Sequence, residues 1–228
     1  MNIIITGAGK GIGFETVKAF IKDPDNNIIA ISRNIDYLKK LEISGENSFL
    51  FPIYYDLADI NIDLKERISS HFNKIDILIN NAGLLINKPF KDLTDNDFDQ
   101  MFNINVKSVF KLINLLLPFF QTASHIVNIS SMGGFQGSAK FKGLSLYSAA
   151  KGALNILTEC LAEEFNEVGV KVNSLALGSV NTEMLQQAFP GYKAAIQPQE
   201  MALFIKNFAE TAHHYLNGKI IPVSLTTP

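Results

Sequence analysis

The stretch Thr6-Gly7-Ala8-Gly9-Lys10-Gly11-Ile12-Gly13 follows the apolar residues 2–5 at the start of the chain. Residues 2–6 predict a buried strand, and the residues after the turn predict a helix. Glycines let the backbone turn sharply and approach a phosphate closely. The helix N-terminus that follows offers free N–H groups and a positive dipole end to an anion. The stretch therefore predicts a strand–turn–helix unit that binds the pyrophosphate of a nucleotide.

The glycine spacing is G-x-x-x-G-x-G rather than the commoner G-x-G-x-x-G, so a tight structural turn without a ligand is the alternative. Its position directly after the first strand of an α/β pattern favours nucleotide binding. The residues expected to contact the cofactor in this turn are Gly7, Gly9, Lys10, Gly11, Ile12 and Gly13.

Short apolar runs alternate with longer helical patterns along the rest of the chain. The runs are rich in Ile and Val and show little polar alternation, which is typical of strands buried on both faces. The strand candidates are Asn2–Thr6, Asn27–Ile31, Phe49–Tyr54, Asp76–Ile79, His125–Ser130, Lys171–Leu175 and Lys219–Val223. The helix candidates are Gly11–Ile21, Ile35–Leu41, Asn61–His71, Asp95–Leu117, Tyr147–Val168 and Gln199–Phe208. This alternation predicts an α/β fold, a doubly wound parallel sheet with helices on both faces.

The bulk composition favours one globular domain over residues 1–228. The chain has 228 residues, is 47% hydrophobic and 18% charged, and carries a net charge of -2. This charge gives no reason to expect nucleic acid or an anionic membrane as a partner. The single cysteine, Cys160, cannot form an internal disulfide, and residues 1–5 read as a strand rather than a signal peptide. We expect a cytoplasmic protein with no membrane-spanning segment.

The end of the second predicted strand bears on which nucleotide binds. NAD sites usually place an acidic residue there, whereas this chain continues with Ser32-Arg33-Asn34. Arg33 could pair with a 2′-phosphate, Ser32 could donate a hydrogen bond to it, and Lys10 points toward the same region. Two cations without an acid favour NADP(H) over NAD(H). The alternative is that Lys10 and Arg33 are ordinary solvated surface charges.

Tyr147 and Lys151 lie four residues apart, on one face of a predicted helix. A phenol has a pKa near 10, and a nearby ammonium favours its ionised form. We therefore expect Lys151 to lower the pKa of Tyr147 and to bring this acid closer to neutral pH, where general acid catalysis works best. An incidental surface pair is the alternative when the spacing is considered by itself.

Taken together, these motifs resemble the short-chain dehydrogenases/reductases, and the likeness runs nearly end to end. The motifs are Thr6–Gly13, Asp56-Leu57, Asn80-Asn81-Ala82-Gly83, Asn105, Ser130-Ser131, and the pair Tyr147 and Lys151. The resemblance implies a single Rossmann-type domain with a seven-stranded parallel sheet in the order 3-2-1-4-5-6-7. Parts of the chain are similar to bacterial 3-oxoacyl-carrier-protein reductases.

The resemblance also implies residue roles. Tyr147 would give a proton to the substrate oxygen, Ser131 would hold that oxygen, and Lys151 would bind the nicotinamide ribose. Asn105 would hold a water that links Lys151 to solvent. Further cofactor contacts are implied at Asp56, Leu57, Asn81, Ala82, Gly83, Gly178, Val180 and Thr182. The alternatives are a strand-end cap for the serines, a backbone-bonded buried amide for Asn105, and a helix N-cap for Thr182.

The chain departs from the family pattern at two places. The spacing from Ser131 to Tyr147 is longer than usual, and we expect this loop to bulge over the substrate and to bring Phe135, Phe141 or Leu144 to the pocket. Ser131 remains the candidate rather than Ser138 or Ser145, because it follows the strand directly. After the sixth strand, Leu177-Gly178 replaces the usual Pro-Gly pair. The missing proline frees φ and adds an N–H group, so a somewhat looser grip on the cofactor is expected.

These features predict an NADPH-dependent oxidoreductase that reduces a ketone or aldehyde, with a 3-oxoacyl thioester as one option. Residues 182–198 would form a short apolar lid. The alternatives are an NADP-dependent secondary-alcohol dehydrogenase and a non-catalytic NADP-binding regulator. Apolar residues on the helices over 95–117 and 147–168 could serve an interface as well as the core, so a homodimer or homotetramer is expected. The histidines show no metal-ligand spacing, and we expect no metal.

Overall fold

The computed structural model describes residues 1–44 and 49–225, and in these residues seven strands form one parallel sheet. Its strand order is β3-β2-β1-β4-β5-β6-β7, which confirms the expected doubly wound topology. The strands are β1 (Asn2–Thr6), β2 (Asn27–Ser32), β3 (Leu50–Tyr54), β4 (Ile75–Asn80), β5 (Phe120–Ser131), β6 (Lys171–Leu177) and β7 (Ile220–Val223).

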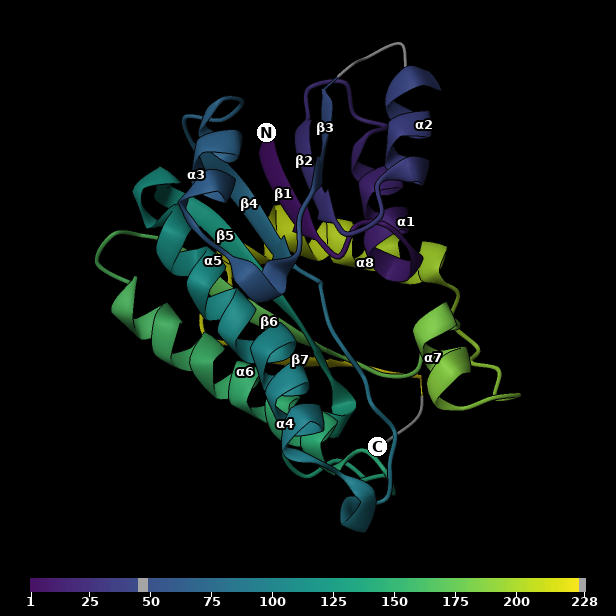
Figure 1. Ribbon diagram of the computed structural model, residues 1–228. Helices are drawn as coiled ribbons and strands as arrows, with labels where there is room; N and C mark the ends of the chain where they lie inside the picture. The colour runs from purple at the N-terminus through teal and green to yellow at the C-terminus, as the bar shows by residue number, and fades with distance from the viewer. Residues whose placement is uncertain (45–48, 226–228) are drawn as a thin grey trace.

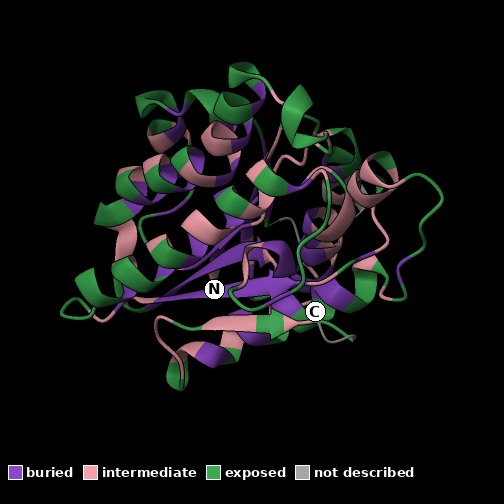
Figure 2. Cartoon of the chain, turned by 90° about the horizontal axis from the view of Figure 1, so that it is seen from below, coloured by how far each residue is buried: buried purple, intermediate pink, exposed green. Residues whose placement is uncertain are grey.

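Helices cover both faces of this sheet (Figure 1). They are α1 (Gly11–Phe20), α2 (Asp36–Ser44), α3 (Ile62–Ser69), α4 (Asp95–Phe102), α5 (Ser108–Leu116), α6 (Ser145–Glu164), α7 (Glu183–Ala188) and α8 (Pro198–Thr211). One core lies between the sheet and α1, α2 and α8, and the other lies between the sheet and α3, α5 and α6. Figure 2 shows the buried sheet enclosed by helices that are exposed on their outer sides.

Alternation along each strand explains how one sheet supplies two cores. Ile3 and Ile5 of β1 belong to the core under α1 and α8, and Ile4 between them belongs to the opposite core. All three are fully buried, which is why the sequence shows a continuous apolar run instead of polar alternation. Since all strands are parallel, their carboxyl ends meet at one edge, where the polar residues that follow them gather.

The helix expected over residues 95–117 is interrupted. Between α4 and α5 the chain forms a π-helical turn, Asn103–Lys107, and after α5 a 3₁₀ turn, Leu117–Phe119. The fully buried Asn105 lies in the π turn, and its Nδ2 donates to the carbonyls of Met101 at 2.9 Å and Leu84 at 2.8 Å. The second bond is made to a distant segment, so a pattern of helical periodicity could not reveal it. Such turns occur frequently at functional sites.

The region expected to form a lid, residues 182–198, contains the short helix α7. Thr182 accepts a hydrogen bond from Leu185 N at 3.3 Å and caps this helix, as the N-cap alternative for Thr182 predicts. Thr94 and Asp97 form a capping box at the start of α4. Among the described residues, no helix has both the length and the apolar character needed to cross a bilayer.

Candidate active site

The glycine turn is bonded to the segment that follows β4. Asn81 Nδ2 donates to the carbonyls of Thr6 at 3.0 Å and Gly7 at 3.2 Å, and Thr6 Oγ1 accepts from the backbone N–H groups of Asn81 and Ala82, both at 3.1 Å. Gly7 has a φ of +63°, and a Cβ there would lie 2.7 Å from Ala82 Cα. Only glycine fits this position, because both the backbone angle and the close approach exclude a side chain.

The N-terminus of α1 is open to a ligand. Lys10 at its N-cap makes no side-chain capping bond, and the first turn carries no acidic residue within this described helix. The first N–H groups of the helix are therefore available to an anion. A groove of about 700 Å³ opens beside them, between the glycine turn and α7, with Gly9, Gly11 and Thr182 in its lining.

The turn also touches the end of β2. A Cβ on Gly9 would collide with Ser32 Oγ and with the carbonyl of Asn34. Lys10 follows Gly9 and Arg33 follows Ser32, so these two exposed cations belong to segments that contact each other. At the end of β3, the exposed Asp56 accepts from Ala58 N at 3.0 Å and caps a 3₁₀ turn that begins with the buried Leu57.

Ser131, Tyr147 and Lys151 come together at the carboxyl edge of the sheet. Ser131 is the last residue of β5, and Tyr147 lies in the first turn of α6, within hydrogen-bonding reach of the Ser131 hydroxyl. Lys151 is one turn further along α6 and is 3% exposed. Its Nζ lies 5.9 Å from the centroid of the Tyr147 ring and donates to Ile129 O at 2.8 Å.

The expectation that the pKa of Tyr147 lies closer to neutral pH than that of a free phenol is wrong. Burial raises the pKa of the Tyr147 phenol to about 12, and the hydrogen bond with Ser131 opposes this shift without cancelling it. Burial also lowers the pKa of the Lys151 ammonium to about 8. Loss of hydration dominates at both groups, a property that the spacing of the two residues does not reveal. At neutral pH the phenol keeps its proton and can act as a donor.

Asn105 joins the same group through Gly83. A Cβ on Gly83 would lie 3.1 Å from Asn105 Oδ1 and 3.5 Å from Lys151 Nζ, so the amide and the ammonium flank this glycine. Asn105 Oδ1 also accepts from Leu84 N at 3.2 Å. Because Gly83 follows Asn81 and Ala82, which hold the glycine turn, one short segment connects the phosphate turn to Lys151.

The loop between β5 and α6 is folded back on itself by Ser138, which was a less favoured candidate for the active serine. Ser138 donates to the carbonyls of Met132 and Phe135, and Lys140 Nζ donates to Phe135 O at 2.7 Å. Of the aromatic and apolar side chains expected at the pocket, Phe141 is 59% exposed, whereas Leu144 is buried. No local pattern marks Ser138, because its partners are defined only by the folded loop.

The second departure from the family pattern, Leu177-Gly178 in place of Pro-Gly, leaves strand β6 intact. Leu177 is the last residue of β6 and pairs with Ser131 on one side and Val223 on the other. Gly178 N donates to Val223 O at 2.8 Å, and the buried Val180 forms a bridge with Ile196. Gly178, Val180 and Thr182 thus lie between the sheet edge and α7.

His125 takes a structural position. His125 is fully buried on β5, with Nδ1 2.9 Å from Ala209 O and Nε2 3.0 Å from Asn173 Nδ2, and burial lowers its pKa to about 4. In the part of the chain that the structure describes, no three His, Cys, Asp or Glu side chains are grouped so that they could hold a metal ion.

Comparisons with known proteins agree with this geometry. A family model described as short chain dehydrogenase matches residues 1–193. The pig protein "Carbonyl reductase [NADPH] 2" is 34% identical over 187 residues, which cover 81% of this chain and 73% of that protein.

Two solved structures share the fold. A short chain dehydrogenase from Burkholderia cenocepacia, in complex with NADP, superposes with a TM-score of 0.85 at 23% identity and covers 97% of this chain and 95% of that one. A 3-ketoacyl-(acyl-carrier-protein) reductase from Brucella melitensis, complexed with NADH, has a TM-score of 0.83 at 23% identity over 97% and 96% of the two chains. The chain therefore belongs to the short-chain dehydrogenase/reductase family of oxidoreductases.

Proposed function

We propose that this chain is an NADPH-dependent reductase of ketones or aldehydes and that Tyr147 is its proton donor. The observation that carries the proposal is the meeting of the Ser131 hydroxyl and the Tyr147 phenol, within reach of each other and next to the buried Lys151. Two hydroxyl groups that meet at the edge of the sheet can both reach one carbonyl oxygen. The reverse reaction, oxidation of a secondary alcohol, uses the same groups in the opposite direction.

The residues present fit a dinucleotide. The uncapped N-terminus of α1 provides backbone N–H groups for a pyrophosphate, and the groove of about 700 Å³ beside it provides the space. Gly9, Lys10, Gly11, Ile12, Gly13, Asn81, Ala82 and Gly83 would line this part, with Asp56 and Leu57 near the base and Gly178, Val180 and Thr182 toward α7. When bound, a nicotinamide cofactor supplies the hydride for carbonyl reduction.

The protein's own groups would handle the proton. Ser131 holds the carbonyl oxygen by a hydrogen bond, and Tyr147 transfers its phenolic proton to that oxygen as the carbonyl becomes an alcohol. A positive charge on Lys151 stabilises the resulting phenolate, because the two groups are close and shielded from water. Asn105, beside Lys151, would hold a water through which the proton is replaced.

The lid favours a substrate with an apolar substituent. Met184, Leu185 and Phe189 are partly buried and lie on or next to α7, which follows the site segment Gly178–Thr182. Apolar side chains there suit an acyl chain, an aromatic ketone or a partly reduced ring, and not a small, highly charged acid. A 3-oxoacyl thioester is one member of this class. We also propose that residues 1–228 form a single domain with its lid at 182–198, in the cytoplasm.

The test is a panel of ketones and aldehydes, including acetoacetyl thioesters, assayed by loss of NADPH absorbance and repeated with NADH. We expect at least one compound with an apolar substituent to be reduced, and faster with NADPH. Tight NADPH binding without oxidation by any compound would contradict the proposal and favour a regulatory protein.

The preference for NADPH is proposed to depend on Arg33 and Lys10. Both are exposed, and they follow residues that touch each other at the mouth of the cofactor site. In Arg33→Asp we expect NADPH affinity to fall about 10- to 100-fold, since hydrogen bonds between charged groups contribute roughly 1.5–3 kcal/mol. The new carboxylate should strengthen NADH binding, because it can accept from the ribose 2′-hydroxyl.

The matched control is Lys22→Asp, which makes the same charge change at an exposed residue beyond the far end of α1. This variant should bind both cofactors as the wild type does. Equal wild-type affinities for NADPH and NADH, measured by titration, would remove the proposed preference.

We further propose that the chain forms a homo-oligomer through α4, α5 and α6. A groove of about 520 Å³ on these helices is lined mainly by Phe98, Phe102, Val106, Phe110 and Leu157. Phe98 is 45% exposed and Phe110 is 52% exposed. Large aromatic side chains on neighbouring helices form an apolar surface of the kind found at interfaces.

A further inference from the structure

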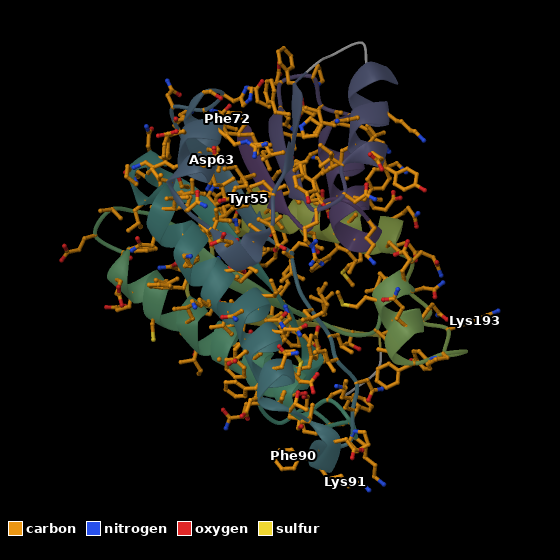
Figure 3. All side chains as sticks on the ribbon, in the orientation of Figure 1. Tyr55, Asp63, Phe72, Phe90, Lys91 and Lys193 are labelled. Carbon is orange, nitrogen blue, oxygen red and sulfur yellow. The ribbon has the colours of Figure 1, made fainter. Side chains whose placement is uncertain are left out.

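The connection between β4 and α4 holds together three segments around the proposed substrate mouth. Figure 1 shows this connection running from the end of β4 past α7 toward the start of α4. Leu84, at its beginning, is bonded to Asn105 through both its N–H and its carbonyl. Asn87 and Lys88, a few residues later, contact α7, the β5–α6 loop and α4. Figure 3 shows Phe90 and Lys91 further along, pointing away from the body of the molecule.

Asn87 caps the end of the lid helix. Its Nδ2 donates to Ala188 O at 2.7 Å, and Ala188 is the last residue of α7. The final carbonyls of a helix have no partner within the helix, so an outside donor stabilises this end. A helix of six residues, as α7 is, is not stable by itself, so bonds from outside, this one included, hold it in place.

The same side chain rests on the β5–α6 loop. A Cβ on Gly143 would collide with Asn87 Oδ1, and Gly143 has a φ of +83°. This position therefore requires glycine for two independent reasons, its backbone angle and the close contact with Asn87. Next to it, Lys88 N donates to Gly143 O at 3.1 Å. Asn87 is thus placed between the loop that carries Ser131 at its start and the lid helix.

Lys88 fixes this arrangement to the body of the protein. Its Nζ contacts both carboxylate oxygens of Asp97, at 2.7 and 2.8 Å. Asp97 also accepts from Thr94 N at 2.9 Å, and the Lys88 and Thr94 bonds hold the pKa of this carboxylate at about 2. The carboxylate is therefore ionised at every pH where the protein would be assayed. The ion pair between Lys88 and Asp97 therefore anchors the backbone next to Asn87 to α4.

We infer that Asn87 is a positioning residue that holds α7 over the carbonyl site, so that the lid and the Ser131 loop close around the substrate together. It touches neither cofactor nor reacting atoms in this role. The expected effect of Asn87 on substrate binding rests on the proposed carbonyl reduction, whereas its effect on the position of α7 does not. A loose lid should weaken substrate binding more than it weakens cofactor binding, because the glycine turn and α1 do not depend on Asn87.

The test compares Asn87→Asp with Asn87→Ala. Aspartate keeps the shape of the side chain but cannot donate, and its oxygen would face the carbonyl of Ala188. With the ketone of the panel that the wild type reduces fastest, we expect KM to rise about 3- to 10-fold, the range for loss of one hydrogen bond. The turnover number should change less, and NADPH affinity should fall by a smaller factor than KM rises, because of the proposed cofactor contacts only Thr182, its N-cap, belongs to α7.

A second readout does not require activity. Lys193 is exposed just beyond α7 and points outward in Figure 3, so it offers a trypsin site that reports on the lid. Cleavage after Lys193, followed by mass spectrometry, should be about 3- to 10-fold faster in both variants. The control is Asn166→Asp, an exposed asparagine after α6. This change should alter neither KM nor the cleavage rate.

The outcomes separate the two proposals. Unchanged cleavage at Lys193 in Asn87→Asp would overturn the positioning role, whatever the activity. Faster cleavage with an unchanged KM would also overturn it, because the lid would then not act on substrate. Faster cleavage in a protein that reduces no carbonyl compound would confirm that Asn87 holds α7 and would count against carbonyl reduction by this chain.

Discussion

At the scale of single residues, Lys151 combines a functional position with a destabilising environment. Its side chain is 3% exposed, its Nζ donates to Ile129 O at 2.8 Å, and burial lowers its pKa from 10.5 to about 8. A depressed ammonium pKa means that the folded state binds this proton less well than the unfolded chain does. Between pH 8 and pH 10.5 the unfolded chain therefore holds more protons, and the free energy of unfolding rises with pH.

Lys151→Met should accordingly be more stable than the wild type at pH 7. The lowered pKa corresponds to about 3 kcal/mol in favour of the variant, and loss of the bond from the ammonium to Ile129 O offsets about 2 kcal/mol of this. The advantage should shrink as the pH approaches 10, where the wild-type lysine becomes neutral. Chemical denaturation of both proteins at pH 7 and pH 10 measures this. A wild type that is the more stable protein at pH 7 would show that the buried ammonium is better compensated than its surroundings indicate.

At the scale of elements, the segment from α4 to α6 shows which features the spacing of apolar residues predicts and which it does not. Apolar spacing correctly predicted helical structure across residues 95–117, and the apolar residues Leu112, Ile113 and Leu116 of this stretch are buried in the core. It could not show that Asn105 would bond to Leu84, a contact that accompanies the break between α4 and α5. It also left open whether the exposed aromatic residues belong to an interface.

Phe110→Glu tests the proposed interface. Phe110 is 52% exposed and lines the groove on α4–α6, so a charge there should disfavour a second copy without disturbing the core. Light scattering should give a mass at a multiple of 25.2 kDa for the wild type and a shift toward 25.2 kDa for the variant. Ile62→Glu, at a residue that is 60% exposed on α3, serves as the control and should keep the wild-type mass. A monomeric wild type would reject the oligomer.

At the scale of the whole molecule, the sequence was sufficient for the topology because seven strand candidates and the glycine turn follow the order of a doubly wound sheet. The resemblance to the family also predicted which side chains would meet, and Ser131, Tyr147, Lys151 and Asn105 do lie together. The pKa of Tyr147 was mispredicted because it depends on the depth of burial, which spacing does not encode. The positions of Asn87 and Ser138 depend on contacts between loops, and these appear only in the folded chain.

The most direct test of the account is Tyr147→Phe, because this change removes the phenolic proton and little else. With the best ketone of the panel, we expect turnover to fall at least ~100-fold, as loss of a general acid does, while NADPH fluorescence shows unchanged cofactor binding. This result would support Tyr147 as the proton donor in an NADPH-dependent carbonyl reductase. Turnover close to that of the wild type would contradict it.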